Sequence, residues 1–392
     1  MKILILVNGK TFAPEVALSF QKSNIQYKLF TTYPKYHIEK YFVEKNNIKS
    51  FLFLEIIKRI LFKISGIFKN KLFFKPGKIF YFFDLLVDYV YSFYINKKYD
   101  LVITGFNSSM IKSIIKAKKM GIKTLYLLTT SSLTHMKKTK NEWKNLGLLN
   151  LYDNAAVSIS EDMEKIIKRC QLTIKESDFI AYQSSFQLRT YVEDKFNTKN
   201  FFYCPQPTNR FIWKKNPEVK NKFIVIFVGN DFVRKGAKYL IEAFNNLSLN
   251  NAELWMVGVD LEKYADILKL NKKNIIFFGT VKEFKLVEIY NKSSVLCVPS
   301  FDEGLPEVIP KAMACGLPII TSQYGSDFIK DNINGFLVEP GNFRELEEKI
   351  KYLYDNPTKL SYMSEKSLET HNNFFTLERY SEKIIKKVFN NL

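Results

Sequence analysis

Short apolar runs alternate with amphipathic segments along this chain, and the alternation starts afresh near its middle. Strands separated by helices form βαβ units, which build a parallel sheet covered by helices. The first series predicts strands at 2–7, 27–32, 100–104 and 123–128, with helices at 15–21 and 110–120. The second predicts strands at 223–228, 252–257, 275–278, 295–298 and 318–321, with helices at 235–246, 285–291 and 308–314. We therefore expect an α/β protein of two Rossmann-like domains that face each other across a cleft.

The length of 392 residues also favours two domains of about 150–200 residues each. The stretch from Cys204 to Arg210 contains two prolines close together and predicts an interdomain hinge. We expect a first domain over 1–205, a second over 206–375, and a C-terminal helix over 376–392 that returns to the first domain. Ligands of parallel sheets bind beyond the carboxyl ends of the strands, so the loops after strands are where chemistry is expected.

The net charge of +20 favours phosphate-bearing ligands, anionic membranes or nucleic acid without choosing among them. The four cysteines are far apart and show no Cys-x-x-Cys spacing, which favours a reducing cytoplasm over a disulfide framework or zinc site. Met1-Lys2 lead directly into a strand-like run, so no signal peptide is expected. No run of 18 uncharged apolar residues occurs, so no spanning helix is expected.

A basic loop follows the first strand of the second series. That strand runs into Gly229, and the loop continues through Arg234 and Lys235 to Gly236. A glycine lets the backbone turn closely around a ligand, while arginine offers a planar fork and lysine a compact charge for a diphosphate. On position alone, a solvated basic helix start explains these residues equally well.

An acidic loop follows the strand at 295–298 and contains Glu303-Gly304 before a helix. A carboxylate on such a turn is presented to the cleft, and the helix start after it exposes backbone N–H groups to anionic or hydroxyl oxygens. The competing interpretation is an ordinary strand–turn–helix with a solvated glutamate, which a lone Glu-Gly would favour.

The stretch from Phe223 to Gly341 resembles the C-terminal donor-binding domain of the retaining glycosyltransferase family 4, which has the GT-B fold. Several pieces match in order over more than a hundred residues. They are Gly229…Arg234-Lys235-Gly236, Val257-Gly258, Phe278-Gly279-Thr280-Val281, Pro299-Ser300-x-x-Glu303-Gly304-Leu305-Pro306, Lys311-Ala-Met-Ala-Cys-Gly-Leu-Pro318, Tyr324-Gly325-Ser and Asn334-Gly335-Phe-Leu-Val-Glu-Pro340.

The resemblance implies a role for each matching residue. Arg234 and Lys235 would hold the donor diphosphate, and Glu303 would hydrogen-bond the donor sugar. The backbone of Thr280 and Val281 would meet the nucleobase. The donor-binding set is completed by Gly9, Gly229, Asn230, Gly304, Leu305, Pro306, Glu307 and Lys311.

Two departures from the family pattern concern the donor site. The family usually carries a second glutamate eight positions after the first, where it accepts hydrogen bonds from the ribose, and this chain has Lys311 there. An ammonium has only donors, so either the ribose is held differently, with Lys311 facing the phosphates, or activity is impaired. Asn230 stands where many members have arginine, a role that Arg234 can take.

The first half of the chain is less diagnostic. The resemblance places a cleft histidine near His135, which could hydrogen-bond the donor sugar, the alternative being an ordinary loop histidine. His37 and His371 lack a comparable setting. Gly9 sits where the family keeps a glycine loop against the phosphates, and 176–185 resembles the last strand of the acceptor domain.

The segment 35–80 has eleven Lys or Arg and three Glu, a net charge of +8, interleaved with apolar residues. Such a surface can lie on an anionic membrane, and a solvated basic helix pair is the alternative. We expect a cytoplasmic protein, with peripheral attachment to the inner membrane face left open. No Asp-x-Asp occurs, so no metal cofactor is implied, and no nucleic-acid-binding module appears.

The sequence therefore predicts a retaining, metal-independent glycosyltransferase that uses a nucleotide-sugar donor and a glycan or lipid-linked acceptor in polysaccharide or glycan assembly. Two alternatives remain at this point. One is a nucleotide-sugar epimerase on the same scaffold, which would need no acceptor. The other is a degenerate, non-catalytic partner protein, for which Lys311 is the motive.

Overall fold

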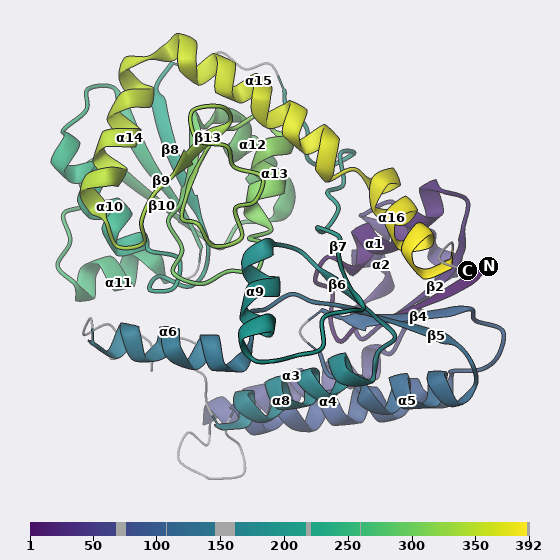
Figure 1. Cartoon of the computed structure of the whole chain (residues 1–392). Coiled ribbons are helices and arrows are strands. Elements are labelled where there is room, and N and C mark those ends of the chain that lie inside the picture. Colours follow the sequence, from purple (N-terminus) through teal and green to yellow (C-terminus); the bar gives the residue numbers. More distant parts are fainter. Residues whose placement is uncertain (68–75, 107, 146–160, 217–220, 259, 390–392) are drawn as a thin grey trace.

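The computed structural model describes all residues except 68–75, 107, 146–160, 217–220, 259 and 390–392. The described residues form two parallel sheets flanked by helices, and the first sheet is complete before the second begins (Figure 1). The predicted pair of Rossmann-like α/β domains is confirmed.

The first sheet has the strand order β3-β2-β1-β4-β5-β6-β7, and every pair is parallel. Its strands are β1 Lys2–Leu6, β2 Gln26–Thr31, β3 Ile48–Ser50, β4 Leu101–Gly105, β5 Lys123–Leu127, β6 Phe179–Tyr182 and β7 Phe201–Tyr203. Its helices are α1 Ala13–Lys22, α2 Lys35–Glu39, the 3-10 turn η1 Lys45–Asn47, α3 Leu52–Ile67, α4 Pro76–Phe93, α5 Ile111–Lys119, α6 Leu133–Asn145, α8 Glu161–Glu176 and α9 Ser185–Glu193.

The expectation that 176–185 holds the last strand of the first domain was wrong. That segment contains β6, and β7 follows it along the edge of the sheet, with Ile180 opposite Phe201. β7 has only three residues, all of them half-buried, so it lacks the buried apolar run that marks an inner strand.

The second sheet has the order β10-β9-β8-β11-β12-β13, again parallel throughout. Its strands are β8 Phe223–Val228, β9 Ala252–Val257, β10 Ile275–Gly279, β11 Val295–Val298, β12 Ile319–Thr321 and β13 Gly335–Leu337. Its helices are α10 Ala237–Leu247, α11 Leu261–Ile267, α12 Glu283–Lys292, α13 Val308–Ala314, α14 Phe343–Asp355 and α15 Pro357–Phe374, and α16 Leu377–Phe389 ends the described chain.

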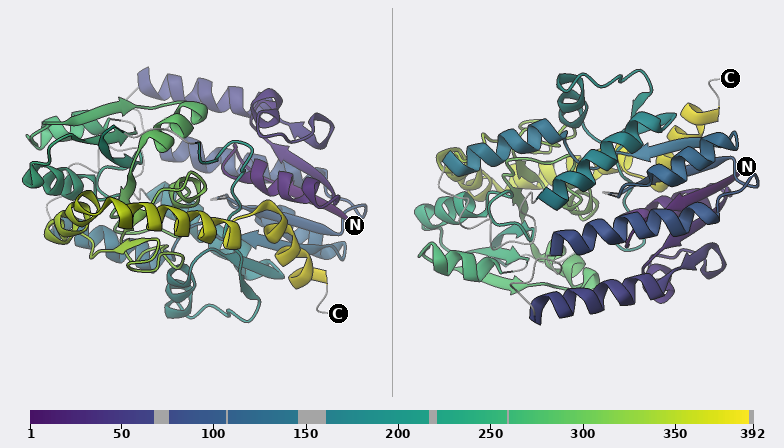
Figure 2. Two further views of the ribbon diagram at one scale, coloured as in Figure 1. Left: turned by 90° about the horizontal axis from the view of Figure 1, so that it is seen from above. Right: turned by 90° about the horizontal axis from the view of Figure 1, so that it is seen from below.

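The chain crosses between the two sheets twice, and the two crossings lie side by side. Thr208, after β7, donates its N–H to the carbonyl of Phe375, which joins α15 to α16, at 2.8 Å. α16 then packs on α1 of the first domain, where Ser381 Oγ lies 2.7 Å from Ser23 Oγ (Figure 1; Figure 2, left). The two connections between the sheets are therefore hydrogen-bonded neighbours.

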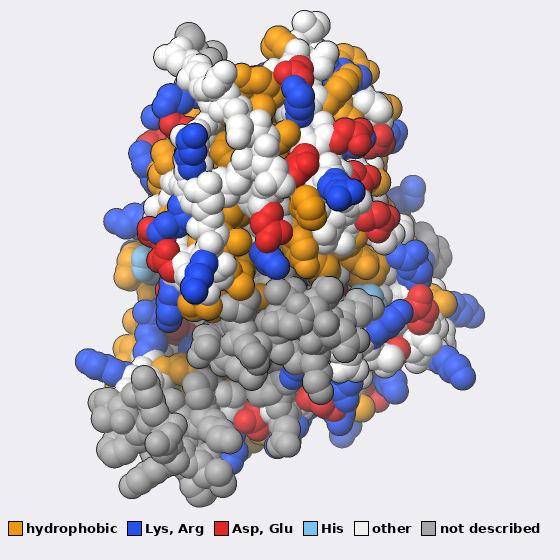
Figure 3. All heavy atoms as spheres, turned by 90° about the vertical axis from the view of Figure 1, so that its left-hand side faces the viewer, with side chains coloured by type: hydrophobic (Ala, Val, Ile, Leu, Met, Phe, Trp, Pro, Cys, Tyr) orange, Lys and Arg blue, Asp and Glu red, His pale blue; other side chains and the backbone are white. Residues whose placement is uncertain are grey.

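Charge is spread unevenly over the surface. Figure 3 shows Lys and Arg side chains projecting on both sides of the lower part of the molecule, whereas acidic and basic side chains mix on the upper part. Within the described residues, no helix combines the length and the apolar character needed to cross a membrane.

Candidate functional site between the two domains

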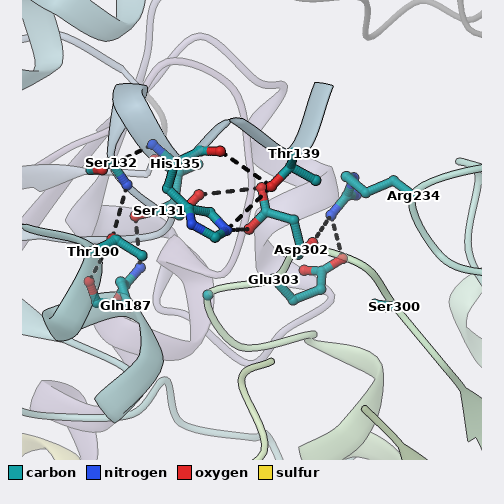
Figure 4. A network of polar contacts seen from close by, with 12 residues as sticks. Ser131, Ser132, His135, Thr139, Gln187, Thr190, Arg234, Ser300, Asp302 and Glu303 are labelled. Atoms are coloured by element: carbon teal, nitrogen blue, oxygen red, sulfur yellow. Dashed lines mark hydrogen bonds and ion pairs between the residues drawn. The ribbon is translucent and has the colours of Figure 1, made fainter. Parts of the chain in front are cut away.

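Glu303 joins the two loops that leave the centre of the second sheet. It lies in the loop after β11, and its Oε1 pairs with Arg234 Nη1 and with Lys235 Nζ from the loop after β8. Arg234 is held further by Asp231, whose Oδ2 lies 3.1 Å from its Nε, and by the carbonyl of Asp302, 2.9 Å from its Nη1 (Figure 4). The two cations and the carboxylate of the sequence motif therefore converge on one point.

The backbone fixes this convergence. Phe301 donates its N–H to the carbonyl of Arg234 at 2.8 Å, so the loops after β8 and β11 are bonded to each other. A side chain at Gly236 would place its Cβ 2.3 Å from the carbonyl of Pro299, which no larger residue tolerates. Gly236 adopts φ 71°, and α10 therefore begins at Ala237, two residues after the predicted start at Lys235.

Burial and charge oppose each other at this point. Burial favours the neutral form of Glu303, but Arg234 and Lys235 outweigh it and hold the pKa of the carboxyl below its usual value. Burial lowers the pKa of Lys235, and the neighbouring Arg234 adds to this effect although Glu303 opposes it. Arg234 pairs with Asp231 and Glu303, and Lys235 pairs with Glu303, so two carboxylates balance these two cations.

The first domain contacts this cluster at Asp302, which lies in the second domain next to Glu303. His135, on α6, places its Nε2 3.8 Å from Asp302 Oδ1, and Ser131 Oγ donates to Asp302 Oδ2 at 3.2 Å (Figure 4). Thr139 Oγ1 lies 3.3 Å from the same His135 nitrogen. Burial raises the pKa of Asp302, although His135 and Arg234 counteract it. Asp302 thus links His135 of the first domain to Arg234 of the second.

Gly304 is where the two domains touch most closely. Its carbonyl accepts a hydrogen bond from Ser184 Oγ of the first domain. A Cβ at this position would lie 2.7 Å from Gln187 Nε2 and 2.7 Å from the carbonyl of Thr129. Only glycine allows the acidic loop to approach the first domain so closely.

A second charged cluster surrounds Lys311 on α13. Its Nζ lies 3.1 Å from Glu307 Oε2 and 3.7 Å from Glu283 Oε1. Burial would lower the pKa of Lys311, but Glu307, Glu283 and Glu15 outweigh burial and raise it. The exchange of the usual glutamate for lysine is therefore accompanied by carboxylates on both sides of the ammonium.

This second cluster also spans the domains. Lys10, in the loop after β1, lies 3.3 Å from Glu283 Oε2 and donates to Tyr41 Oη. Beside it is a cavity of about 340 Å³, lined by residues of both domains: Lys10, Tyr33, His37, Lys40, Tyr41, Ile212, Lys282, Glu283 and Phe284. His37, for which the sequence offered no role, therefore faces an interdomain cavity.

The remaining predicted donor residues lie around these clusters. A Cβ at Gly229 would lie 3.1 Å from Lys235 Cγ, and Gly9, at φ 103°, precedes Lys10. Thr280 is exposed and Val281 half-buried, and they lead into α12, which begins at Glu283. Asn230 is exposed, while Leu305 and Pro306 are buried between Gly304 and Glu307. The structure thus groups the predicted residues around two points rather than one.

Sequence reasoning missed several members of both clusters. Asp302 and Lys10 are direct chain neighbours of the predicted Glu303 and Gly9, so adjacency could have indicated them. Glu15 and Glu283 carry no local signal. The contact of Glu283 with Lys311 depends on how α12 and α13 pack, and the influence of Glu15 on Lys311 depends on how the domains face each other. Glu15 is 3% exposed, and its Oε2 finds no hydrogen-bond partner among the described residues.

The second domain is similar to known proteins. Residues 209–370 match the model of a family described as glycosyl transferases group 1. An uncharacterized glycosyltransferase of Haemophilus influenzae is 30% identical over 188 residues, which cover 46% of this chain and 52% of that protein. An N,N'-diacetylbacillosaminyl-diphospho-undecaprenol alpha-1,3-N-acetylgalactosaminyltransferase of Campylobacter jejuni is 27% identical, over 41% of this chain and 43% of that protein.

Solved structures resemble the whole chain. A sucrose-phosphate synthase of Thermosynechococcus elongatus superimposes with a TM-score of 0.71 at 16% identity, covering 100% of this chain and 99% of that one. HepE of Anabaena, solved with UDP and glucose, gives a TM-score of 0.69 at 14% identity and covers 100% of both chains. These likenesses show the GT-B fold.

The curated sequence relatives match over a limited part of their length. This chain spans about half of the Haemophilus and Campylobacter proteins. The family match and these relatives support a group 1 glycosyltransferase, and the name of the Campylobacter protein refers to a lipid-linked glycan.

Proposed function

We propose that this chain is a glycosyltransferase of family 4 that moves a sugar from a nucleotide-diphosphate-sugar to a hydroxyl acceptor with retention. The observation that carries the proposal is the meeting of Arg234 and Lys235 with Glu303 at the end of the second sheet, opposite His135 of the first domain. Two cations at this place suit a diphosphate, and a carboxylate with an adjacent histidine suits sugar hydroxyls.

Donor binding requires the internal ion pairs to exchange partners. In the ligand-free protein Glu303 pairs with both Arg234 and Lys235, and Asp231 also pairs with Arg234. A diphosphate would take over both cations and free Glu303 to accept hydrogen bonds from the sugar. The cations then stabilise the negative charge that develops as the diphosphate leaves, a contact whose loss costs about 3–4 kcal/mol in comparable sites.

The resemblance supplies the stereochemical course that we propose. The acceptor hydroxyl attacks on the face from which the diphosphate leaves, and a donor phosphate oxygen accepts its proton. His135 and Asp302 would orient the sugar from the side of the first domain, because they bridge the two domains beside Glu303. The anomeric configuration of the product, read by proton NMR, tests retention.

We also propose that Glu307 and Glu283 replace the acceptor oxygens that Lys311 lacks. Both carboxylates lie within 3.7 Å of the ammonium, and the residues before Glu283 are those expected to meet the nucleobase. A ribose placed here could donate to either carboxylate while its oxygens accept from Lys311. In this proposal the pairing of Lys311 with Glu283 and Glu307 allows the ribose to be bound although the usual second glutamate is absent.

The remaining features of the proposal follow the resemblance and the relatives. The acceptor would be a glycan or lipid-linked glycan, since the Campylobacter relative is named for a diphospho-undecaprenol substrate. The protein would act in the cytoplasm at the inner membrane face. No metal would be required, because Arg234 and Lys235 would meet the diphosphate charge, and transfer that persists in excess EDTA tests this point.

A thermal-shift panel of nucleotide diphosphates and nucleotide sugars tests the function, with UDP as the first probe because HepE was solved with it. We expect one nucleotide to stabilise the wild type and Arg234→Ala to lose the shift. Glu303→Ala should keep the shift with the diphosphate but lose the added effect of the sugar. Arg344→Ala, which removes an exposed arginine on α14, is the matched control. A panel without any shift would contradict the proposal.

A further inference from the structure

The outer side of α3 is apolar although it faces solvent. Phe53, Ile56, Ile57 and Ile60 are 53%, 49%, 43% and 52% exposed. Their spacing of three and four residues aligns them along one stripe of the helix. A surface helix of a globular protein normally turns such a stripe toward the core.

α4, which packs beside α3, repeats this arrangement. Its inner stripe is buried in the core, as Val87 and Tyr91 are 0% exposed. Its outer stripe contains Phe82, Tyr89 and Phe93, which are 54%, 47% and 63% exposed. A helix with apolar residues on two opposite sides can bury only one of them against its own domain. The outer stripe of α4 is therefore exposed to water unless a partner covers it.

The acidic residues of these two helices point inward. Glu55, Asp84 and Asp88 are at most 5% exposed. Asp84 accepts from the N–H of Ser109 at 3.1 Å, and Asp88 accepts from the N–H of Ser113 at 2.9 Å. Asp84 and Asp88 are therefore used within the domain. Glu55 also pairs with Arg59, and Asp88 with Arg169, so the charge of these two arginines is partly offset.

Basic side chains flank the two apolar stripes. α3, α4, α5 and α8 lie next to one another on one side of the first sheet (Figure 2, right). Together they contain twelve basic and seven acidic residues, a net charge of +5. The acidic residues of α8 are partly paired, as in Lys168–Glu164 at 2.9 Å. The exposed cations are Arg59, Lys63, Lys112, Lys118, Lys119, Lys165, Lys168 and Lys175.

A pocket of about 390 Å³ lies where the apolar stripe of α4 meets these cations. It is lined by Phe82, Leu86 and Tyr89 of α4, by Lys112 of α5 and by Arg169 of α8, among others. Lys112 Nζ lies 4.1 Å from the centre of the Tyr89 ring. Asp88 also lines the pocket and pairs with Arg169 at 3.4 Å, so Lys112 is the cation that apolar walls leave for a phosphate on an acyl chain.

We propose that the exposed side of α3, α4, α5 and α8, here called the outer helical face, docks on an anionic phospholipid surface. The apolar stripes of α3 and α4 enter the interfacial region, and the lysines of α5 and α8 contact the headgroup phosphates. This inference rests on the proposed function, because docking on a membrane would bring the proposed transferase site to a lipid-linked acceptor. Of segment 35–80, for which such a contact is expected from the sequence, α3 and the start of α4 belong to this face, α2 lines the interdomain cavity, and 68–75 lie outside the described residues.

Sedimentation with vesicles tests the proposal. We expect the full chain to bind vesicles of phosphatidylcholine with 30% phosphatidylglycerol (an experimental choice of about one third anionic lipid) and to bind pure phosphatidylcholine weakly. Ile56→Glu with Ile60→Glu should lower the partition coefficient at least tenfold. Val192→Glu with Ile267→Glu is the matched control, because both residues are 51% exposed but lie outside the outer helical face.

A second variant, which removes charge, keeps the test valid if Ile56→Glu with Ile60→Glu fails to fold. Lys165→Ser with Lys168→Ser should weaken binding to the anionic vesicles and leave the melting temperature close to that of the wild type. Equal binding to both vesicle types would overturn the proposal, as would equal loss in the control pair. Self-association that light scattering detects and Ile56→Glu with Ile60→Glu abolishes, without vesicle binding, would assign the face to a second copy and also overturn it.

The test is independent of the catalytic proposal. The stabilising shift with UDP should persist in Ile56→Glu with Ile60→Glu, because α3 contributes no residue to the two charged clusters. Vesicle binding should persist in Arg234→Ala, which alters only the donor site. A protein that binds vesicles but no nucleotide would therefore refute the proposed function while leaving the membrane contact standing.

Discussion

Lys311 and Glu307 face each other one helical turn apart, with 3.1 Å between Nζ and Oε2. Glu283 approaches the same ammonium from α12 and also pairs with Lys10 of the first domain. The lysine that interrupts the family pattern is thus the centre of a charged network that reaches across the cleft. The carboxylates around Lys311 suit a positive charge. This should decide what happens when the glutamate that is usual in the family is placed at this position.

Replacing Lys311 with glutamate should damage the protein rather than repair it. The change would add a carboxylate to Glu15, Glu283 and Glu307 and leave Lys10 as their nearest cation. Breaking a fully buried pair typically costs about 3–5 kcal/mol, and solvent screens this pair in part because Lys311 is 20% and Glu307 42% exposed. We expect Lys311→Glu to lower the free energy of unfolding by about 1–2 kcal/mol in chemical denaturation, whereas Lys311→Arg should change it far less.

The same substitution discriminates between the interpretations of this site. If the lysine marks an impaired enzyme, Lys311→Glu should increase transfer or nucleotide affinity. An increase of that kind would contradict the proposal that Glu283 and Glu307 hold the ribose together with Lys311.

Removing the charge of Glu303 should separate nucleotide binding from transfer. Glu303 occupies Arg234 and Lys235 in the ligand-free protein, so it competes with a diphosphate for them. We expect Glu303→Gln to tighten UDP binding by about tenfold in calorimetry, since a charge-assisted hydrogen bond is worth about 1.5–3 kcal/mol. Transfer from a nucleotide sugar should fall about a hundredfold, because the sugar loses its carboxylate.

A weaker affinity for UDP in Glu303→Gln would show that this carboxylate supports the nucleotide instead of competing with it. Arg234→Ala provides the comparison, because it should weaken UDP and the nucleotide sugar alike.

The inner strands and the motif loops could be predicted because their signals are local. β8, for example, occupies the predicted span Phe223–Val228, since a buried strand between glycine and polar residues leaves a continuous apolar run. β3, β7 and β13 escaped prediction because they have three residues each and, unlike the equally short β12, are not buried along their whole length. The start of α10 was misjudged because Arg234 and Lys235 fit a helix, and the left-handed conformation of Gly236 is a tertiary effect.

At the candidate site, too, contacts set by the topology of one sheet could be predicted, and contacts set by tertiary packing could not. Arg234 and Glu303 lie on loops that parallel-sheet topology brings to one edge, so their proximity follows from the strand order. The contact of Lys10 with Glu283 joins residues 273 positions apart in different domains. No spacing rule covers such a pair, because it depends on the relative orientation of two sheets.

Burial of Glu15 should make stability fall as the pH rises. Burial is the main reason that the pKa of this carboxyl is raised to about 7, against the lowering effect of Lys311. The folded protein therefore binds more protons than the unfolded chain above about pH 4.5, and it loses stability as pH increases through 7. Between pH 6 and 8 the loss amounts to about 1 kcal/mol.

Glu15→Gln should remove this dependence, because the amide resembles the protonated acid. We expect the melting temperature of the variant to exceed that of the wild type by more at pH 8 than at pH 6. Glu39→Gln in α2 is the control, since Glu39 is only half-buried. Parallel pH profiles for Glu15→Gln and the wild type would refute this explanation.

His371 on α15 should produce the opposite trend at acidic pH. Burial, followed by the nearby Arg210, lowers its pKa to about 4. The unfolded chain then binds more protons below about pH 6.5, so stability is lost as pH falls toward 4. Between pH 7 and 5 we expect a loss of about 2 kcal/mol, which His371→Leu should abolish and His37→Leu, at a partly buried position, should not.

Gly304 should control how closely the two domains can approach. A methyl group there would lie 2.7 Å from Gln187 Nε2 and 2.7 Å from the carbonyl of Thr129, and the latter is backbone that cannot move aside alone. Gly304→Ala should therefore open the cleft and separate His135 from Asp302, which are 3.8 Å apart in the intact protein. Overpacking of this kind commonly costs about 1–3 kcal/mol.

The variant should retain UDP binding, since Arg234 and Lys235 lie wholly on the second domain, yet lose transfer by about a hundredfold. Small-angle scattering should detect a larger radius of gyration. Gly121→Ala supplies the control for backbone strain, because Gly121 has φ 73° but nothing within 4 Å of its Cβ. Ser184→Ala removes the hydrogen bond to Gly304 without adding bulk, so it should have a smaller effect. If Gly304→Ala transfers sugar at the wild-type rate, contact between the domains at this point is not needed for the reaction.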